Sequence, residues 1–168
     1  MSTLTVRPAA PGDIAALHPV VERAYRGVTA RVGWTHEADL VTGDRTDVAT
    51  LNSLLAGDSR LLIALDGSVP IGCVNVANRG GRLAYLGLLC VDPQRQASGV
   101  GKRLIHAAEG TARELYSANR IEMTVIEQRA ELIAWYERHG YARNGDTRPF
   151  PISLDPPLRM VVLVKAFD

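Results

Sequence analysis

The junction at residues 91–102 constrains this chain most, because an apolar run passes there through a glycine-rich turn into an amphipathic segment. The apolar residues 86–91 predict a buried strand, and the apolar positions that recur at helical spacing after Gly99 predict a helix. Gly99 and Gly101 let the backbone approach an anion closely, because neither residue carries a Cβ atom. The first N–H groups of such a helix are unpaired and lie at its positive end. The junction therefore predicts a site for a phosphorylated ligand.

The spacing within this junction excludes two familiar phosphate-binding loops. A P-loop needs a glycine five residues before Gly101, where Gln96 stands, and a hydroxyl residue after Lys102, where Arg103 stands. The dinucleotide-binding fingerprint needs a third glycine at the position of Leu104. Neither a P-loop nor a dinucleotide-binding loop is therefore expected.

The remaining pattern is Gln-x-x-Gly-x-Gly at residues 96–101, preceded by Val-x-Pro at residues 91–93. It resembles the pyrophosphate loop of the GNAT N-acetyltransferase superfamily. A second match lies at residues 131–141, which resemble the family's short helix carrying a tyrosine, here Tyr136, closed by a glycine and an aromatic residue. The two motifs stand in the family's order. The chain is identified on these grounds as a member of the GNAT superfamily.

Periodicity and turn residues predict a mixed α/β layer with both antiparallel and parallel strands. Pro19 is expected to kink the first helix or to mark a restart in it. The expected strands cover residues 4–6, 60–65, 71–78, 82–91 and 121–125, a segment from 141, and residues 158–165; the expected helices cover residues 14–25, 44–55 and 100–118 and a short segment ending at 139. The resemblance implies about seven mostly antiparallel strands and about four helices, with a parallel fourth and fifth strand that splay apart to admit coenzyme A.

Composition narrows the classes of partner. A length of 168 residues predicts one domain over residues 1–168, and a net charge of +1 argues against nucleic-acid binding. No apolar run reaches the roughly 20 residues that span a bilayer, and no signal peptide is evident, so a cytoplasmic protein is expected. Cys73 and Cys90 read as reduced core thiols, and the scattered histidines predict no metal site.

The resemblance implies direct transfer of an acetyl group from acetyl-coenzyme A (acetyl-CoA) to a primary amine, without a covalent enzyme intermediate. Main-chain groups of Leu89, Cys90 and Val91 are expected to hold the pantetheine arm and the thioester oxygen. Arg129 stands where the family often has an asparagine that binds pantetheine, and it is expected either to reach a phosphate or to line the acceptor site. The residues expected to bind the pyrophosphate are Gln96, Ala97, Ser98, Gly99, Val100, Gly101 and Lys102.

Tyr136 stands where the family places its tyrosine, so the resemblance implies that it acts as the acid for the leaving thiolate. A phenol is protonated at neutral pH and can donate that proton. Several family members carry a glutamate as base on the fifth strand, where this chain has Thr124. Glu127 is the first candidate for that base, and Glu122 or a chain of waters is the alternative. Cys90 is not expected to be a nucleophile, because nothing pairs it with a base.

The acceptor is expected to be an amine on a small molecule or a peptide. A non-catalytic acyl-coenzyme A sensor on the same fold stays open as an alternative, since Thr124 replaces the glutamate. Homodimers are common in the family, so a homodimer is a possible assembly. The residues expected to line the acceptor pocket are Tyr25, Trp34, Glu37, Tyr85, Tyr141 and Phe150.

Overall fold

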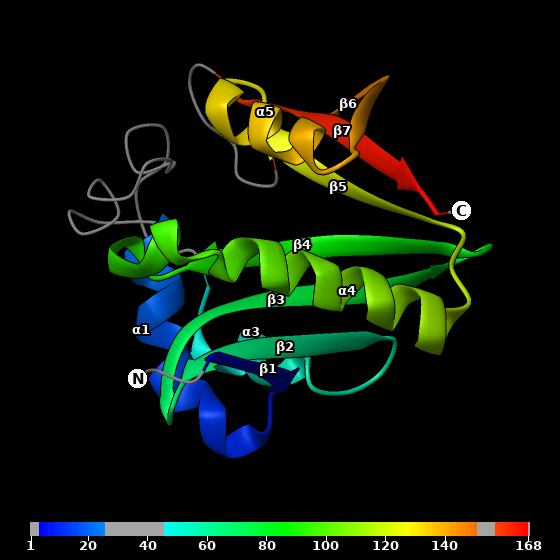
Figure 1. The fold of residues 1–168 in the computed structure, drawn as a ribbon. Coiled ribbons are helices and arrows are strands. Elements are labelled where there is room, and N and C mark those ends of the chain that lie inside the picture. Colours follow the sequence, from blue (N-terminus) through cyan, green and yellow to red (C-terminus); the bar gives the residue numbers. More distant parts are fainter. Residues whose placement is uncertain (1–3, 26–45, 151–156, 168) are drawn as a thin grey trace.

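Seven strands form one mixed sheet in the order β1-β2-β3-β4-β5-β7-β6 (Figure 1). The structure is a computed structural model, and it describes residues 4–25, 46–150 and 157–167. The strands are β1 (Leu4–Pro8), β2 (Ser59–Asp66), β3 (Val69–Gly80), β4 (Leu83–Val91), β5 (Arg120–Ile126), β6 (Ala142–Pro149) and β7 (Arg159–Ala166). The helices are α1 (Ile14–Tyr25), α3 (Val48–Ser53), α4 (Val100–Tyr116) and α5 (Ala130–Arg138), with short 3₁₀ helices η1 (Pro11–Asp13) and η2 (Pro93–Ser98).

The pairing of the strands confirms the predicted mixed sheet. β4 and β5 run parallel, and the other neighbouring strands pair antiparallel. Pro19 lies inside α1 without ending it, so the helix does not restart there. Among the described residues, no helix is both long and apolar enough to cross a membrane.

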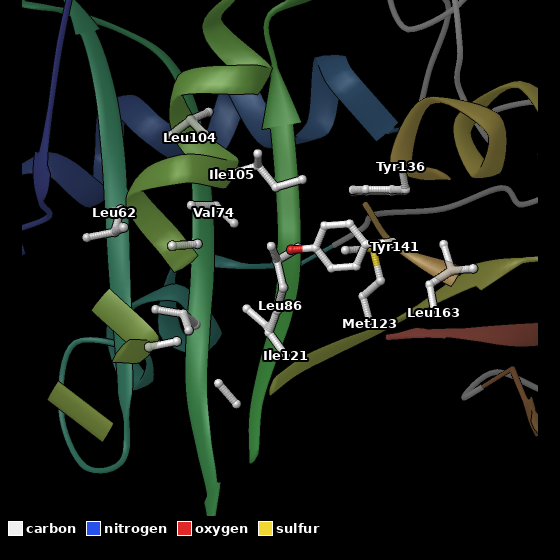
Figure 2. Packing of buried hydrophobic residues seen from close by; sticks show 14 of the residues in the cluster. Leu62, Val74, Leu86, Leu104, Ile105, Ile121, Met123, Tyr136, Tyr141 and Leu163 are labelled. Carbon is white, nitrogen blue, oxygen red and sulfur yellow. The ribbon is translucent and has the colours of Figure 1, made fainter. Parts of the chain in front are cut away.

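Helices cover both faces of the sheet's first half, with α4 on one face and α1 on the other (Figure 1). Side chains that alternate along β2 divide between the two cores: Leu62 packs in the core beneath α4, and Ile63 packs in the core beneath α1. Figure 2 shows the α4 core, which continues across β4 to Met123 of β5 and Leu163 of β7. This continuous core joins the two halves of the sheet.

The parallel pairing of β4 with β5 is short. It comprises Leu83 with Arg120, Ala84 with Ile121, and Tyr85 with Glu122. Beyond Tyr85 the two strands part, and β5 continues toward β7 (Figure 1). The sheet therefore contains the splayed pair that the motifs predict, and the gap widens toward the carboxyl ends of both strands.

Candidate functional site

A β-bulge interrupts β4 beside the gap. Between the register pairs Cys73–Cys90 and Asn75–Gly87, β4 has two intervening residues where β3 has one. Leu88 in this bulge has a φ of 52°, a left-handed conformation that a leucine rarely adopts. Leucine carries no sequence signal for such a conformation, so the bulge could not be predicted from the sequence.

The bulge lies open to the gap, and its carbonyl oxygens are engaged. Residues 87–89 are half-buried, whereas Leu86 and Cys90 on either side of them are buried. The Tyr25 hydroxyl donates a hydrogen bond to the carbonyl of Leu89, and the thiol of Cys73 lies 3.5 Å from the carbonyl of Leu88. Tyr25, expected in the acceptor pocket, thus holds the backbone on which the thioester is expected to lie.

The turn after β4 is held by Asp92. Its N–H group donates to the carbonyl of Ile71 over 2.7 Å, which attaches the turn to β3. Its carboxylate accepts from the N–H group of Gln94 at 3.2 Å and pairs with Arg23 of α1 at 3.0 Å. The Val-x-Pro segment of the motif is therefore a turn held by hydrogen bonds and an ion pair, and it leads through η2 to the start of α4.

The N-terminus of α4 forms the predicted anion cradle. Gly99 has φ 79° and ψ 11°, and no side chain caps the helix there. A Cβ atom at Gly99 would meet nothing within 4 Å, so no described atom crowds that side of the glycine. The first intrahelical bond runs from the N–H group of Arg103 to Gly99, which leaves the N–H groups of residues 100–102 at the positive end of the helix. Lys102 is exposed beside them, and this arrangement fits a pyrophosphate.

Helix α5 closes one side of this cradle. A Cβ atom at Gly101 would lie 3.4 Å from the Trp135 ring, so α5 packs against the first turn of α4 there. The centroids of the Trp135 and His139 rings are 4.3 Å apart, and His139 Nδ1 lies 2.8 Å from the Trp135 carbonyl oxygen. The two motifs of the sequence therefore meet in space.

Tyr136 lies beside the gap and is only 5% exposed. Its ring meets the Trp135 ring edge-on at a centroid distance of 5.1 Å and the Tyr141 ring edge-on at 5.8 Å. Figure 2 shows Tyr136 and Tyr141. Burial raises the pKa of Tyr136 well above its usual value, while the positive charge of Arg129 opposes that rise and Tyr85 adds to it. The phenol therefore keeps its proton at neutral pH, as an acid for a leaving thiolate requires.

Arg129 lies at the N-terminus of α5, where its carbonyl accepts the first helical hydrogen bond, from Ile133 at 3.0 Å. Burial lowers the pKa of its guanidinium, and the electrostatic influence of Tyr25 and Tyr136 raises it. The residue that replaces the family's asparagine thus brings a positive charge within electrostatic reach of the tyrosine on α1 and the tyrosine on α5.

Tyr141 lies in the α4 core rather than on an open pocket surface. It is 2% exposed, and its hydroxyl donates to Glu109 of α4 over 2.8 Å. Lys165 of β7 lies 3.1 Å from both oxygens of the same carboxylate. Tyr141 therefore helps to attach β6 and β7 to α4, a role that its position in the motif does not reveal.

Both candidate bases are engaged by arginines. Glu127 faces Arg159 through two contacts of 3.0 and 3.3 Å, in a hollow of about 600 Å³ that Gln128 and Pro157 also line. Glu122 accepts from Arg148 at 3.1 and 3.3 Å. The Glu127 side chain is 40% exposed and that of Glu122 is 11% exposed, so Glu127 is the more accessible carboxylate.

The other expected acceptor residues do not lie together. Tyr85 lies at the gap, where its hydroxyl and that of Thr124 share a 2.7 Å hydrogen bond. Phe150 packs with a small apolar cluster at the carboxyl end of β5. Trp34 and Glu37 lie outside the described residues.

In the pyrophosphate loop, residues 96–98 form the last residues of η2, directly before Gly99.

Comparison with known proteins agrees with this geometry. A 69-residue stretch is 32% identical to the spermine/spermidine N(1)-acetyltransferase of Bacillus subtilis and covers 41% of this chain and 45% of that protein. The aligned region is thus less than half the length of this curated relative. The structure resembles the Escherichia coli ribosomal-protein-S18-alanine N-acetyltransferase, with a TM-score of 0.76, 16% identity, and coverage of 99% of this chain and 95% of that one.

The fold is also that of the PaiA N-acetyltransferase from Thermoplasma acidophilum in complex with coenzyme A. The TM-score is 0.72 at 16% identity, over 98% of this chain and 99% of that one. The sequence profile of the acetyltransferase (GNAT) family matches residues 21–141, which include both motifs. The predicted family and fold are confirmed: this chain belongs to the acetyltransferase (GNAT) family.

Proposed function

We propose that this chain transfers an acetyl group from acetyl-CoA directly to a primary amine in a ternary complex. One observation carries the proposal: the gap between β4 and β5 joins the α4 cradle, the β4 bulge and the buried phenol of Tyr136. These are the anchor, the carbonyl-polarising backbone and the acid that the reaction needs. A non-catalytic acyl-coenzyme A sensor is the alternative, and it has no need of the acid.

Acetyl-CoA, when bound, supplies the activated carbonyl carbon. The N–H groups at the start of α4 and the charge of Lys102 hold its pyrophosphate. Main-chain groups of Leu89, Cys90 and Val91 hold the pantetheine arm. An N–H group released by the bulge donates to the thioester oxygen, a contribution that can reach about 3 kcal/mol as charge develops there. Arg129 places its positive charge where the sulfur leaves.

Two proton transfers complete the proposal. Tyr136 donates its proton to the departing sulfur, and Glu127 accepts a proton from the amine. Glu127 stands at the carboxyl end of β5 in an open hollow, and it becomes a free base when the amine displaces Arg159. Glu122 or an ordered water is the alternative acceptor, and the Glu122 carboxylate is held by Arg148.

Polyamines are the proposed acceptor class. The support is the similarity to the spermine/spermidine N(1)-acetyltransferase of Bacillus subtilis. The site also contains an opposite charge for an ammonium group: the Glu127 side chain is 40% exposed in the hollow at the end of β5.

Thermal unfolding with acetyl-CoA, coenzyme A and ATP tests donor binding. A ligand at 100 times its Kd adds about 2.7 kcal/mol, which raises the Tm of a chain of this size by roughly 5–11 °C. We expect that shift with both coenzyme A species and none with ATP. No shift at millimolar acetyl-CoA would contradict the proposal.

Turnover separates the enzyme from the sensor. Release of free thiol is measured with spermine, spermidine and an alanine-terminated peptide as acceptors. The proposal expects release with the polyamines, whereas a sensor binds acetyl-CoA and releases no thiol with any amine. The single domain, the cytoplasmic location and the homodimer stay predictions.

A further inference from the structure

The closed end of the gap is formed by two side chains that meet across it. Pairing of β4 with β5 ends at Tyr85 and Glu122, and the next residue on the same face of β5 is Thr124. The hydroxyls of Tyr85 and Thr124 are 2.7 Å apart and share a hydrogen bond. This hydrogen bond therefore spans the gap immediately beyond the point where the strands separate.

The Tyr85 ring is held along β4 toward the bulge. A Cβ atom at Gly87 would lie 3.3 Å from Cε1 of Tyr85, so the ring extends over Gly87 and depends on the missing side chain there. The Arg79 guanidinium covers the ring at 4.4 Å. Because the ring reaches Gly87, it ends next to Leu88, the first residue of the bulge.

We propose that the Tyr85–Thr124 pair forms the closed end of the acyl-binding site and restricts the donor to short acyl groups. The inference rests on the proposed function, in which the thioester lies at the β4 bulge. The pyrophosphate cradle lies at the open, carboxyl-terminal end of β4. An acyl chain on the thioester therefore extends in the opposite direction, toward Tyr85.

The pair resists displacement because its polar groups are already satisfied. A longer acyl chain that moves the Tyr85 ring breaks the hydrogen bond to Thr124 and the contact with Arg79. Tyr85 also affects the pKa of Tyr136, which places the pair near the phenol assigned to the leaving sulfur. In a closed apolar site, one added methylene changes selectivity by about 10–200-fold.

The test compares kcat/KM for butyryl-CoA with kcat/KM for acetyl-CoA, using one amine throughout so that changes in the acceptor pocket cancel. We expect Tyr85→Leu to raise the butyryl-to-acetyl ratio by about tenfold or more. Tyr85→Phe keeps the ring and loses the hydrogen bond, so its ratio should rise less. Thr124→Ala should also raise the ratio. Tyr116→Leu is the matched control: Tyr116 ends α4, and its hydroxyl lies 3.4 Å from the Val76 carbonyl of β3.

Two results would overturn the inference: a wild type that uses butyryl-CoA as well as acetyl-CoA, or a Tyr85→Leu ratio equal to that of Tyr116→Leu. If Tyr85→Leu fails to fold, the butyryl-to-acetyl ratios of Tyr85→Phe and Thr124→Ala test the inference instead. Calorimetry gives the affinities for butyryl-CoA and acetyl-CoA, and their ratio measures the same preference without turnover. If the protein binds both thioesters but never acetylates an amine, the proposed function is wrong. The ratio of the two affinities then still tests the inference. A wild type that binds neither thioester rejects both.

Discussion

At the scale of single residues, Tyr136→Phe tests the proposed acid. Loss of a general acid costs about 10²–10⁴-fold, so kcat should fall by about 100-fold or more while the affinity for acetyl-CoA stays nearly unchanged. Because burial raises the pKa of Tyr136, the phenol stays protonated beyond its ordinary pKa of about 10. The wild-type kcat should therefore show no alkaline decline from this group below about pH 10. Steady-state rates across pH and calorimetry measure both effects, and a fully active variant would reject the assignment.

Glu127→Gln tests the proposed base at the same scale. The amide keeps the size of the side chain and removes its basicity, so kcat should fall by about 100-fold if Glu127 takes the proton. Glu122→Gln is the matched control, because it also removes a carboxylate paired with an arginine of the β6–β7 hairpin. The measurement is kcat against pH for both variants. Equal activity of Glu127→Gln and wild type would leave water or Glu122 as the acceptor.

At the scale of secondary-structure elements, the contact between β3 and β4 depends on Gly72. A Cβ atom there would lie 2.6 Å from the Cys90 carbonyl oxygen and 3.3 Å from the Cα atom of Val91, both backbone atoms of β4. We expect Gly72→Ala to destabilise the fold by about 1–3 kcal/mol, which lowers the Tm by about 2–4 °C per kcal/mol.

Gly110→Ala is the control for this prediction, since a Cβ atom at Gly110 of α4 meets nothing within 4 Å. Alanine favours a helix by up to about 1 kcal/mol over glycine, so this variant should be more stable than wild type. Thermal unfolding of both variants and of wild type measures these differences in stability. A Gly72→Ala protein as stable as wild type would show that β4 shifts freely beside the bulge.

At the scale of the whole molecule, the two halves of the sheet are joined by the short β4–β5 ladder and by α4. Tyr141→Phe removes one link, the hydrogen bond to Glu109. A hydrogen bond to a charged group contributes about 1.5–3 kcal/mol, so the Tm should fall by roughly 3–12 °C. Tyr116→Phe, which loses a long 3.4 Å contact with the Val76 carbonyl, should change the Tm little.

The dependence of this effect on pH follows from the pKa of Tyr141. Burial, Glu109 and Tyr136 all raise that pKa in the folded state. The folded state therefore holds the phenolic proton more tightly than the unfolded state, whose tyrosine pKa is about 10. The contribution is complete below about pH 10 and is lost as the pH rises further. The difference in stability between wild type and Tyr141→Phe should shrink above that pH, and a constant difference in alkaline unfolding experiments would contradict this account.

Local patterns of the chain were sufficient for the family, the order of elements and the cradle at Gly99 and Gly101. These features depend on periodicity, on backbone freedom and on a helix end, all of which are encoded within a few neighbouring residues. The position of Tyr136 followed from a motif of the same local kind. Its pKa did not, because that value depends on burial and on charges brought from other elements.

Only the tertiary structure decided how the site is completed. The Tyr85–Thr124 hydrogen bond and the link from Tyr141 to Glu109 each join segments distant in sequence. The left-handed Leu88 lies where the register between β3 and β4 shifts. Arginines from β6 and β7 likewise determine that both candidate carboxylates are paired. The sequence by itself determined which elements form and where a phosphate can bind. The pairing of those elements determined the bulge, the proton donor's environment and the closed end of the gap, because those properties arise from contacts between strands and helices rather than within them.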